Sequence, residues 1–284
     1  TSRNFYGVLR VSDIMSKNAG VARILHNGAT THGMQFLQGI LERVPVSYYD
    51  QLSGVGYAIM RHPLRVAEAN SDGQNSAGLK IGVIGLGAGT LAAYGHPQDT
   101  IHFYEINPEV DRISRKYFTY RANSPAKIDV AIGDARLVME AELDSTGSQK
   151  FDVLVIDAFS SDAIPMHLLT RECNEIYWRH LKPDGILAVH VSNRTIDLIP
   201  VVHALAREAH RQAIVLKSDE EAPEKGNPGA FDATWILVTS NQDFLQDAQV
   251  VKRIKEKGRV LTDEDPSVLW TDDYGSLWQV LRCS

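Results

Sequence analysis

Residues 80–105 read KIGVIGLGAGTLAAYGHPQDTIHFYE and contain the pattern that decides the fold. A short apolar run ends at a G-x-G-x-G turn formed by Gly85, Gly87 and Gly89, and a second run ends at Glu105, 20 positions after the first glycine. Such a turn lets the backbone approach a ligand closely, and an acid at this spacing can accept both hydroxyls of a ribose. The stretch therefore predicts a nucleoside-binding βαβ unit.

The chain beyond this stretch continues to alternate short apolar runs with amphipathic segments, which is typical of a mostly parallel sheet. The predicted strands are 81–84, 101–105, 128–131, 151–156, 186–191, 213–217 and 235–239. Helical spacing covers 108–120, 166–180 and 197–209, and Asn107 is the expected N-cap before Pro108. We expect an α/β fold with a Rossmann-like, methyltransferase-type seven-stranded sheet and a small N-terminal β lobe.

The first 66 residues differ in character from the rest of the chain. Residues 5–11 and 21–25 are expected to form short strands, glycines punctuate them, and residues 48–60 are expected to be helical. A polar, glycine-containing linker at 69–78 then marks a boundary. We therefore predict an N-terminal β lobe with a connecting helix at 1–68 and a nucleoside-binding catalytic domain at 79–284, and a second polar segment, 218–229, is expected to be a loop.

Composition excludes several classes of function. The chain has 29 basic and 35 acidic residues, and a net charge of −6 argues against affinity that comes from neutralising phosphates. The two cysteines, Cys173 and Cys283, have no partners at metal-ligand spacing, and a reducing compartment fits. The longest uncharged apolar run, 81–95, is too short to span a bilayer. We expect no nucleic-acid partner, no metal and no membrane insertion by this chain.

A further loop joins the predicted nucleoside site. Gly133, Asp134 and Ala135 follow the third strand, where a carboxylate is well placed for the exocyclic amine of a base. The turn is G-x-G-x-G rather than G-x-G-x-x-G, and a crevice lined by Asp134 suits an S-adenosyl nucleoside better than a dinucleotide. A nicotinamide dinucleotide remains an alternative at this point.

The loop after the fourth strand reads DAFSSDAIP over residues 157–165 and carries two carboxylates, Asp157 and Asp162. Transfer of an alkyl group from a sulfonium to an amine requires a neutral amine, because an alkylammonium with a pKa of about 10.4 has no lone pair to attack with. One carboxylate can take that proton, and the other can hold the distant ammonium of a diamine.

With these residues the sequence resembles the spermidine synthase family, whose fourth strand ends in a similar Asp-Ser-Ser-Asp-Pro loop. Asp157 and Asp162 match its two acidic positions, with two extra residues between them here. The stretch Leu25-His26-Asn27-Gly28 followed by Gln35, and the stretch Ser47-Tyr48-Tyr49-Asp50, resemble motifs of the family's N-terminal lobe and acceptor pocket. The resemblance covers the chain from about Leu25 to Val191.

The resemblance implies an aminopropyltransferase that moves an aminopropyl group from decarboxylated S-adenosylmethionine to a polyamine such as putrescine. S-adenosylmethionine itself is the other possible donor co-substrate. The implied roles are the base for Asp157, substrate binding for Gln35, Tyr48, Tyr49 and Asp162, and nucleoside binding for Gly85, Gly87, Gly89, Glu105, Asp134 and Ala135. No prosthetic group is implied. We also expect a cytoplasmic homo-oligomer. The sequence looks closest to the branch fused behind a multi-helix membrane region, which would tether the full-length protein.

One departure from the family leaves the donor open. Spermidine synthases carry an acid in the glycine turn, and Ala88 occupies that position here, so Asp50 and Asp273 are candidates for a compensating acid. The alternatives are an S-adenosylmethionine-dependent methyltransferase and a non-catalytic polyamine or nucleoside-binding module. His32 could also shuttle a proton, although a structural role is the preferred interpretation because Asp157 supplies a base.

Overall fold

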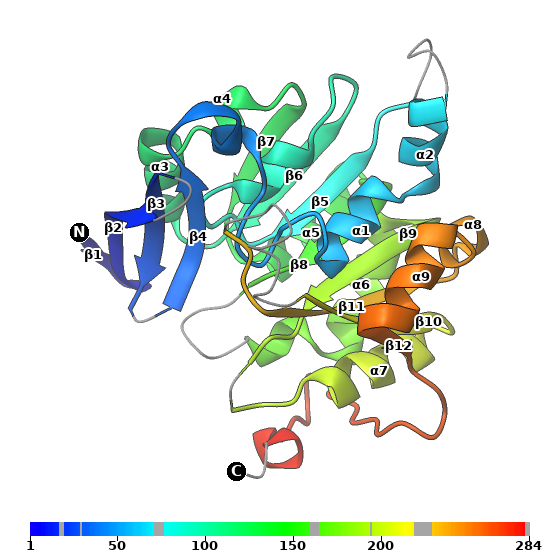
Figure 1. Ribbon diagram of the computed structural model, residues 1–284. Coiled ribbons are helices and arrows are strands. Elements are labelled where there is room, and N and C mark those ends of the chain that lie inside the picture. The colour runs from blue at the N-terminus through cyan, green and yellow to red at the C-terminus, as the bar shows by residue number, and fades with distance from the viewer. Residues whose placement is uncertain are drawn as a thin grey trace.

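The computed structural model describes residues 1–16, 20–28, 30–70, 77–158, 165–193, 195–218 and 229–281. Two sheets organise this part of the chain, a four-stranded antiparallel sheet of β1–β4 and an eight-stranded mixed sheet of β5–β12 (Figure 1). The small sheet, with strands β1 (Ser2–Asn4), β2 (Gly7–Ser16), β3 (Gly20–Asn27) and β4 (Thr30–Phe36), forms the β lobe. The predicted linker at 69–78 includes residues 71–76, which lie outside the described residues.

The large sheet has the order β12-β10-β11-β9-β8-β5-β6-β7. Its strands are β5 (Lys80–Ile84), β6 (Thr100–Glu105), β7 (Lys127–Ile132), β8 (Phe151–Ile156), β9 (Leu181–His190), β10 (Gln212–Ser218), β11 (Ala233–Thr239) and β12 (Gly258–Val260). The strands from β7 to β9 pair in parallel, whereas β11, β10 and β12 add antiparallel pairs. The order reverses between β5 and β8, and a crevice at the carboxyl ends of strands is expected at such a point.

The predicted Rossmann-like fold with a separate β lobe is confirmed, and seven of these eight strands lie at the predicted positions. The eighth, β12, was missed because its three residues directly follow a helix and show no alternating pattern. It pairs with the outer edge of β10, where Gly258 lies opposite Leu216.

The helices begin where their caps predict. Asn107 accepts a hydrogen bond from the Glu109 amide and starts α3, and Asp134 and Thr170 cap α5 and α6 in the same way. The helices are α1 (Gly54–Met60), α2 (Pro63–Asn70), α3 (Pro108–Tyr117), α4 (Tyr120–Asn123), α5 (Ala135–Ser145), α6 (Arg171–His180), α7 (Ile199–Glu208), α8 (Gln242–Leu245) and α9 (Ala248–Lys257). Short 3₁₀ turns are η1 (Gly39–Arg43), η2 (Thr90–Tyr94), η3 (Met166–Leu168) and η5 (Leu277–Val280).

The helix expected at 48–60 is shorter than predicted. It begins only at Gly54, because the Ser53 hydroxyl caps the Gly56 amide and the preceding residues turn toward the large sheet. Helix α1 packs on β8, β9, β10 and β11 rather than on the β lobe. The loop before it therefore brings Tyr48 and Tyr49 to the large sheet.

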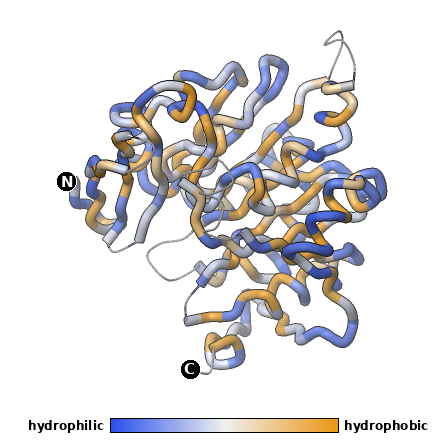
Figure 2. Tube along the Cα trace, viewed as in Figure 1, coloured by the Kyte–Doolittle hydropathy of each residue, from blue (hydrophilic) through white to orange (hydrophobic). Residues whose placement is uncertain are grey.

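Two hydrophobic clusters fill the two faces of the large sheet. In β8, Val153 and Val155 belong to one cluster and Leu154 and Ile156 to the other, as the alternation of a doubly covered strand requires. Helices α1, α3, α8 and α9 contribute to the first cluster, and α5, α6 and α7 contribute to the second. Figure 2 shows the apolar residues along the central strands and the hydrophilic ones concentrated at the periphery.

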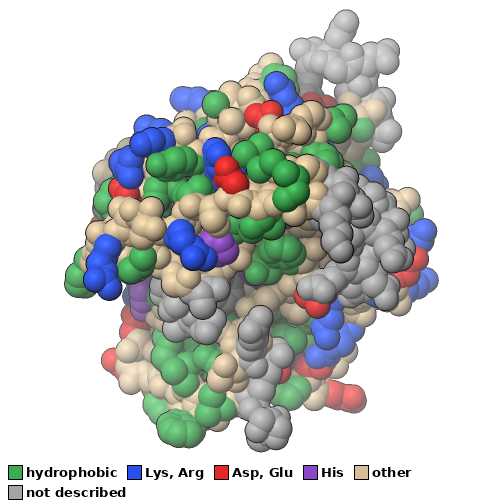
Figure 3. Space-filling view, turned by 60° about the vertical axis from the view of Figure 1, so that its left-hand side comes forward, with side chains coloured by type: hydrophobic (Ala, Val, Ile, Leu, Met, Phe, Trp, Pro, Cys, Tyr) green, Lys and Arg blue, Asp and Glu red, His purple; other side chains and the backbone are tan. Residues whose placement is uncertain are grey.

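The β lobe buries side chains on both faces of its sheet. Ala22, Ile24, Met34 and Phe36 form a small core of their own with Val46. On alternate positions, Leu9 and Leu25 belong to the core of the large domain, and Gly33 to Phe36 of β4 are all buried. The exposed residues of β2 are Arg10, Asp13, Ile14 and Met15, and this side of the molecule mixes hydrophobic side chains with Lys and Arg (Figure 3).

Strand β4 of the lobe rests directly on the glycine turn (Gly85–Gly89) of the large domain. The carbonyl oxygen of His32 accepts a hydrogen bond of 3.2 Å from the Ala88 amide. A Cβ atom added to Gly33 would lie 2.5 Å from the Cβ of Ala88, and one added to Gly87 would lie 2.4 Å from the His32 oxygen. The lobe can approach this closely only because these two positions lack side chains.

We therefore expect Gly33→Ala to loosen this contact. Overpacking typically costs about 1–3 kcal/mol, and the φ of +140° at Gly33 adds strain. Chemical denaturation should show a lower free energy of unfolding than for Gly28→Ala, a control that also has positive φ but no atom within 4 Å of the added Cβ. Equal losses for the two variants would contradict a tight contact at β4.

Candidate active site

A cavity of about 270 Å³ lies at the carboxyl ends of β5, β6, β7 and β8, and the β lobe forms its opposite wall. The predicted site residues that line it are Tyr49, Gly85, Gly87, Glu105, Asp134, Ala135 and Asp157. His32 lines it from the lobe. The topology thus gathers side chains from segments more than 100 positions apart into one crevice, as the strand reversal predicts.

The glycine turn has the backbone conformation that its sequence suggests. Gly85, Gly87 and Gly89 have φ values of 100°, 52° and 82°. A Cβ atom at Gly85 would lie 2.5 Å from the carbonyl oxygen of Asp157, so the turn packs against the start of the reactive loop. Gly89 does not line the cavity and instead faces the Arg121 side chain.

Glu105 is buried at the end of β6 and holds the turn in place. Its Oε2 accepts a hydrogen bond of 2.9 Å from the Leu86 amide, and its Oε1 accepts one of 2.8 Å from the Asn107 amide. Burial raises the pKa of Glu105, and these two amides oppose that shift by stabilising the carboxylate. Each oxygen keeps a second lone pair, so the carboxylate can still accept bonds from the cavity.

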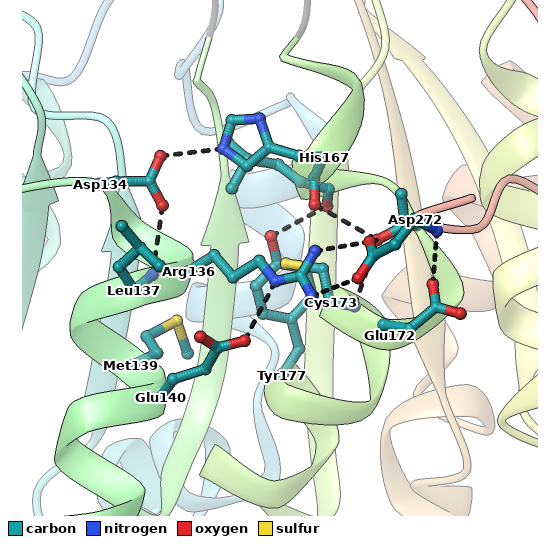
Figure 4. Close-up of polar contacts among 12 residues, drawn as sticks. Asp134, Arg136, Leu137, Met139, Glu140, His167, Glu172, Cys173, Tyr177 and Asp272 are labelled. Atoms are coloured by element: carbon teal, nitrogen blue, oxygen red, sulfur yellow. Dashed lines mark hydrogen bonds and ion pairs between the residues drawn. The ribbon is translucent and has the colours of Figure 1, made fainter. Parts of the chain in front are cut away.

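The Asp134 carboxylate contacts a histidine that the sequence analysis did not include in the site. One oxygen caps α5, accepting a hydrogen bond of 3.2 Å from the Leu137 amide, and the other lies 2.9 Å from Nε2 of His167 (Figure 4). Both Asp134 and His167 line the cavity. The face of Asp134 that would bind the amine of a base is thus shared with an imidazole.

The acidic segment near the C-terminus, which contains the candidate Asp273, lies outside the cavity. Asp272 forms two hydrogen bonds of 2.6 Å with the Arg136 guanidinium on α5, which lowers the pKa of Asp272 (Figure 4). Asp273 is exposed and does not line the cavity. The 271–274 segment is therefore held against α5 outside the cavity, and Asp273 is not placed to compensate for Ala88.

Asp157 ends β8 and is held from two sides. The Tyr49 hydroxyl donates a hydrogen bond to Oδ2 of Asp157, and Nδ1 of His190 lies 2.6 Å from Oδ1. Burial, followed by the Asp157 charge, raises the pKa of Tyr49 well above its ordinary value. Tyr49 therefore remains a donor at neutral pH, and the Asp157 side chain that accepts its hydrogen bond lines the cavity.

Sequence reasoning missed His190. It ends β9, the strand next to β8, in the same position that Asp157 occupies just past the end of its own strand. A histidine where the fifth parallel strand ends, next to a strand that ends in the predicted base, was the available signal. The sequence does not show that β9 pairs with β8, and this pairing is what places His190 beside Asp157.

Two of the predicted substrate-binding residues, Gln35 and Tyr48, do not line the cavity. Gln35 is buried outside the cavity, where its amide bonds to Thr119 and to the Glu42 carbonyl, so it joins the β lobe to the start of α4. Tyr48 packs edge-on against Tyr49 and also does not line the cavity. Asp162 lies outside the described residues, and its role stays a prediction.

Position 88 has no room for the acid that the family places in the turn. Ala88 is 2% exposed, packs on Gly33 and does not line the cavity. A carboxylate here would point into β4 rather than toward a ligand. Asp50 is also fully buried outside the cavity, so neither position supplies the acid that the family uses.

His32 faces the cavity from the lobe. Burial lowers its pKa, while the nearby Asp157 charge opposes this shift. Its Nε2 atom is buried and accepts or donates no hydrogen bond to any residue that the structure describes. The imidazole is therefore neutral at neutral pH and has a nitrogen available to a ligand.

The strand order and the position of the cavity define an α/β domain of the Rossmann-like, methyltransferase type. The solved structure of a probable spermidine synthase from Corynebacterium glutamicum ATCC 13032 shares this fold, with a TM-score of 0.61 and 17% identity over 93% of this chain and 96% of that one. Spermidine synthase from Thermotoga maritima superposes with a TM-score of 0.55 and 15% identity over 94% of this chain and 79% of that one.

Sequence relatives name the family more directly. A polyamine aminopropyltransferase of Vibrio vulnificus (strain CMCP6) is 33% identical over 114 residues, 39% of this chain and 37% of the relative. A probable polyamine aminopropyl transferase of Bifidobacterium longum (strain NCC 2705) is 30% identical over 129 residues, 44% of this chain and 26% of the relative. The names of these two relatives support the spermidine synthase family, and the solved structures show the shared fold.

A third relative has a different name. An N-terminal histidine N-methyltransferase of Emericella nidulans (strain FGSC A4 / ATCC 38163 / CBS 112.46 / NRRL 194 / M139) is 28% identical over 216 residues, 72% of this chain and 37% of the relative. The chain thus spans at most 37% of the length of these three curated relatives. No family model matches the chain. The branch with a fused membrane region stays a prediction.

The described residues contain neither a membrane-crossing helix nor a metal-binding cluster. Among them, no helix combines the length and the apolar character needed to cross a bilayer. Within the same residues, no group of three or more His, Cys, Asp or Glu side chains is arranged to hold a metal ion.

Glu105 gives the most direct test of the cavity. Glu105→Gln would replace one acceptor oxygen by an amide donor facing a backbone N–H, and it removes the charge offered to a ribose. Hydrogen bonds to charged groups contribute about 1.5–3 kcal/mol, so calorimetry should show methylthioadenosine binding weakened by roughly 10- to 100-fold. The control is Glu140→Gln, at a partly exposed pair with Arg136 outside the cavity. Unchanged affinity in the folded Glu105 variant would contradict the assignment.

Proposed function

We propose that this chain is an aminopropyltransferase that moves an aminopropyl group from decarboxylated S-adenosylmethionine to a polyamine such as putrescine. The observation that carries the proposal is the placement of Asp157, whose carboxylate lines the cavity between Tyr49 and the glycine turn. This is where a base must lie to act on an amine that attacks a nucleoside sulfonium. The names of two curated relatives support the same activity.

The nucleoside half of the donor fits the wall formed by β5, β6 and β7. Glu105 would accept the ribose hydroxyls, and Asp134 would accept a hydrogen from the exocyclic amine of adenine. Gly85 and Gly87 leave their backbone open to the ligand. No prosthetic group enters this account, because the donor is a co-substrate that brings its own leaving group.

The reaction needs one proton removed and one bond exchanged. Asp157 takes a proton from the acceptor ammonium, which leaves a neutral amine with a lone pair. That lone pair attacks the carbon next to the sulfonium, the carbon–sulfur bond breaks, and its electrons return to sulfur. The products are methylthioadenosine and a longer polyamine, which keeps a positive charge on the new secondary nitrogen. One proton is therefore left on the protein and passes to solvent.

Tyr49 keeps the base in position. Its hydroxyl donates to Oδ2 of Asp157 and holds the carboxylate plane fixed relative to the cavity. Tyr94 in turn holds Tyr49, because the Tyr94 hydroxyl donates a hydrogen bond of 2.6 Å to the Tyr49 carbonyl. Asp162 would hold the far ammonium of the acceptor, as its match to the family's second acid implies.

A methyltransferase is the second candidate, and Ala88 is the observation that favours it. The decarboxylated donor carries an ammonium that the family receives with an acid in the turn, and position 88 cannot supply one. The fungal N-methyltransferase aligns with 72% of this chain. The β lobe and the base at Asp157 favour aminopropyl transfer instead, and a non-catalytic binding module would need neither Tyr49 nor Asp157 in this geometry.

We expect Asp157→Asn to abolish most turnover without abolishing nucleoside binding. Asparagine keeps the shape but cannot take a proton, and positioned proton transfer contributes about 10²–10⁴-fold. Release of methylthioadenosine from decarboxylated S-adenosylmethionine and putrescine should therefore slow by that factor, while methylthioadenosine affinity stays within about threefold.

Two tyrosine variants provide the matched comparison for Asp157→Asn. Tyr49→Phe should lower kcat by roughly 10-fold through loss of the bond to the carboxylate. Tyr120→Phe removes another buried hydroxyl, which bonds to the Met34 and Val44 carbonyls outside the cavity, and should leave kcat unchanged. Near-normal turnover in Asp157→Asn would mean that a different group is the base.

A further inference from the structure

A histidine and a carboxylate meet in the wall of the cavity. Nε2 of His167 lies 2.9 Å from Oδ2 of Asp134, and both side chains line the cavity (Figure 4). An ionised carboxylate only accepts hydrogen bonds, so the imidazole carries a hydrogen on Nε2 and donates it to Asp134. The direction of this bond is the same whether or not the second ring nitrogen is also protonated.

Asp134 has a hydrogen-bond donor on each of its two oxygens. Oδ1 accepts the bond of 3.2 Å from the Leu137 amide, and Oδ2 accepts the bond from His167. A carboxylate oxygen has two lone pairs, so each oxygen keeps one for a ligand. The χ2 torsion of an aspartate is otherwise soft, but rotation of this carboxylate would break one of the two bonds. The remaining lone pairs therefore have a fixed direction.

The helices that follow Asp134 and His167 are tied together at their first turns. Asp134 caps α5, and His167 lies in η3, just before Thr170, which caps α6. The Thr170 hydroxyl donates a hydrogen bond of 2.9 Å to Oδ1 of Asp272. Both oxygens of Asp272 also accept bonds from Arg136 in the first turn of α5 (Figure 4). Asp272 thus keeps the start of α6 next to the start of α5, and with it His167 next to Asp134.

Folding stability does not account for the contact between His167 and Asp134. Their side chains are 46% and 21% exposed. A pair this exposed contributes little to stability, because water competes for both partners. A base that enters the cavity would exclude water from the pair, and hydrogen bonds become stronger where the local dielectric constant falls. The contact therefore gains strength when the cavity is filled.

From this geometry, and resting on the nucleoside site of the proposed function, we propose that His167 is a positioning residue that fixes Asp134 to accept the 6-amino group of adenine. Nε2–H of His167 holds one oxygen of Asp134, the Leu137 amide holds the other, and a free lone pair accepts a hydrogen of the exocyclic amine. A purine without that amine offers no hydrogen and leaves the carboxylate without this partner. His167 thus determines how strongly the site prefers a 6-aminopurine.

The test compares two ligands that differ only at the 6-position of the base, namely methylthioadenosine and its analogue with hydrogen in place of the 6-amino group. Calorimetry gives the ratio of their dissociation constants for each variant. A hydrogen bond to a charged group predicts a preference of roughly 10- to 100-fold for methylthioadenosine in the wild type. In His167→Ala this ratio should fall by roughly 10-fold, because the carboxylate is no longer held toward the amine. A loss of packing alone would weaken both ligands and leave the ratio unchanged.

Two further variants complete the comparison. His167→Gln places an amide N–H close to the position of Nε2, so it should keep the ratio within about twofold of the wild-type value. His96→Ala removes a matched pair outside the cavity, in which Nδ1 of His96 lies 2.9 Å from Oε2 of Glu68 and the side chains are 46% and 23% exposed. This control should leave the ratio unchanged.

The outcomes separate the role of His167 from the proposed reaction. A ratio in His167→Ala as large as that of the wild type would overturn the proposal, and so would a ratio in His167→Gln as low as that of His167→Ala. A wild type that binds neither nucleoside would overturn it together with the nucleoside site. If the ratios follow the expectation while no donor yields a transfer product, the proposed function fails and the recognition of the base by Asp134 and His167 stands.

Discussion

The cavity exists because no side chain projects from Gly85 or Gly87. A Cβ atom at either position would come within 2.5 Å of a backbone oxygen, that of Asp157 for Gly85 and that of His32 for Gly87. Three segments distant in sequence can therefore close around one point, namely the turn after β5, the loop after β8 and strand β4 of the lobe. The same contact that joins the β lobe to the large domain also forms the wall facing the ligand.

The need to hold the glycine turn in place explains why a carboxylate is buried beside it, although burial of a charge is unfavourable. Glu105 is buried and its pKa is raised, yet its two oxygens receive the amides of Leu86 and Asn107. The carboxylate thus holds the turn open while it faces the cavity. Asp157 is held in a similar way, because Tyr49 and His190 each contact one oxygen of its carboxylate, which lines the cavity. A base fixed this way needs little reorganisation when the amine arrives.

Much of this fold could be predicted from sequence because its signals are local. Apolar runs bounded by turns located seven strands, and Asn107 and Pro108 located the start of α3. Contacts that depend on tertiary packing were harder to predict from the sequence. The sequence placed Gln35 in the site, but its amide joins β4 to Thr119. For His190, the end of the predicted fifth strand was the available signal, and the pairing of β9 with β8 brings it next to Asp157. Residue type suggested the chemistry, whereas strand order decided which residues meet.

The proposed function depends on which group is transferred, and the mass of the polyamine product identifies that group. The protein would be incubated with decarboxylated S-adenosylmethionine or with S-adenosylmethionine, in each case with a panel of diamines and polyamines. We expect a product heavier by one aminopropyl group, formed together with methylthioadenosine from the decarboxylated donor alone. A methylated product formed together with S-adenosylhomocysteine, or no transfer from either donor, would contradict it.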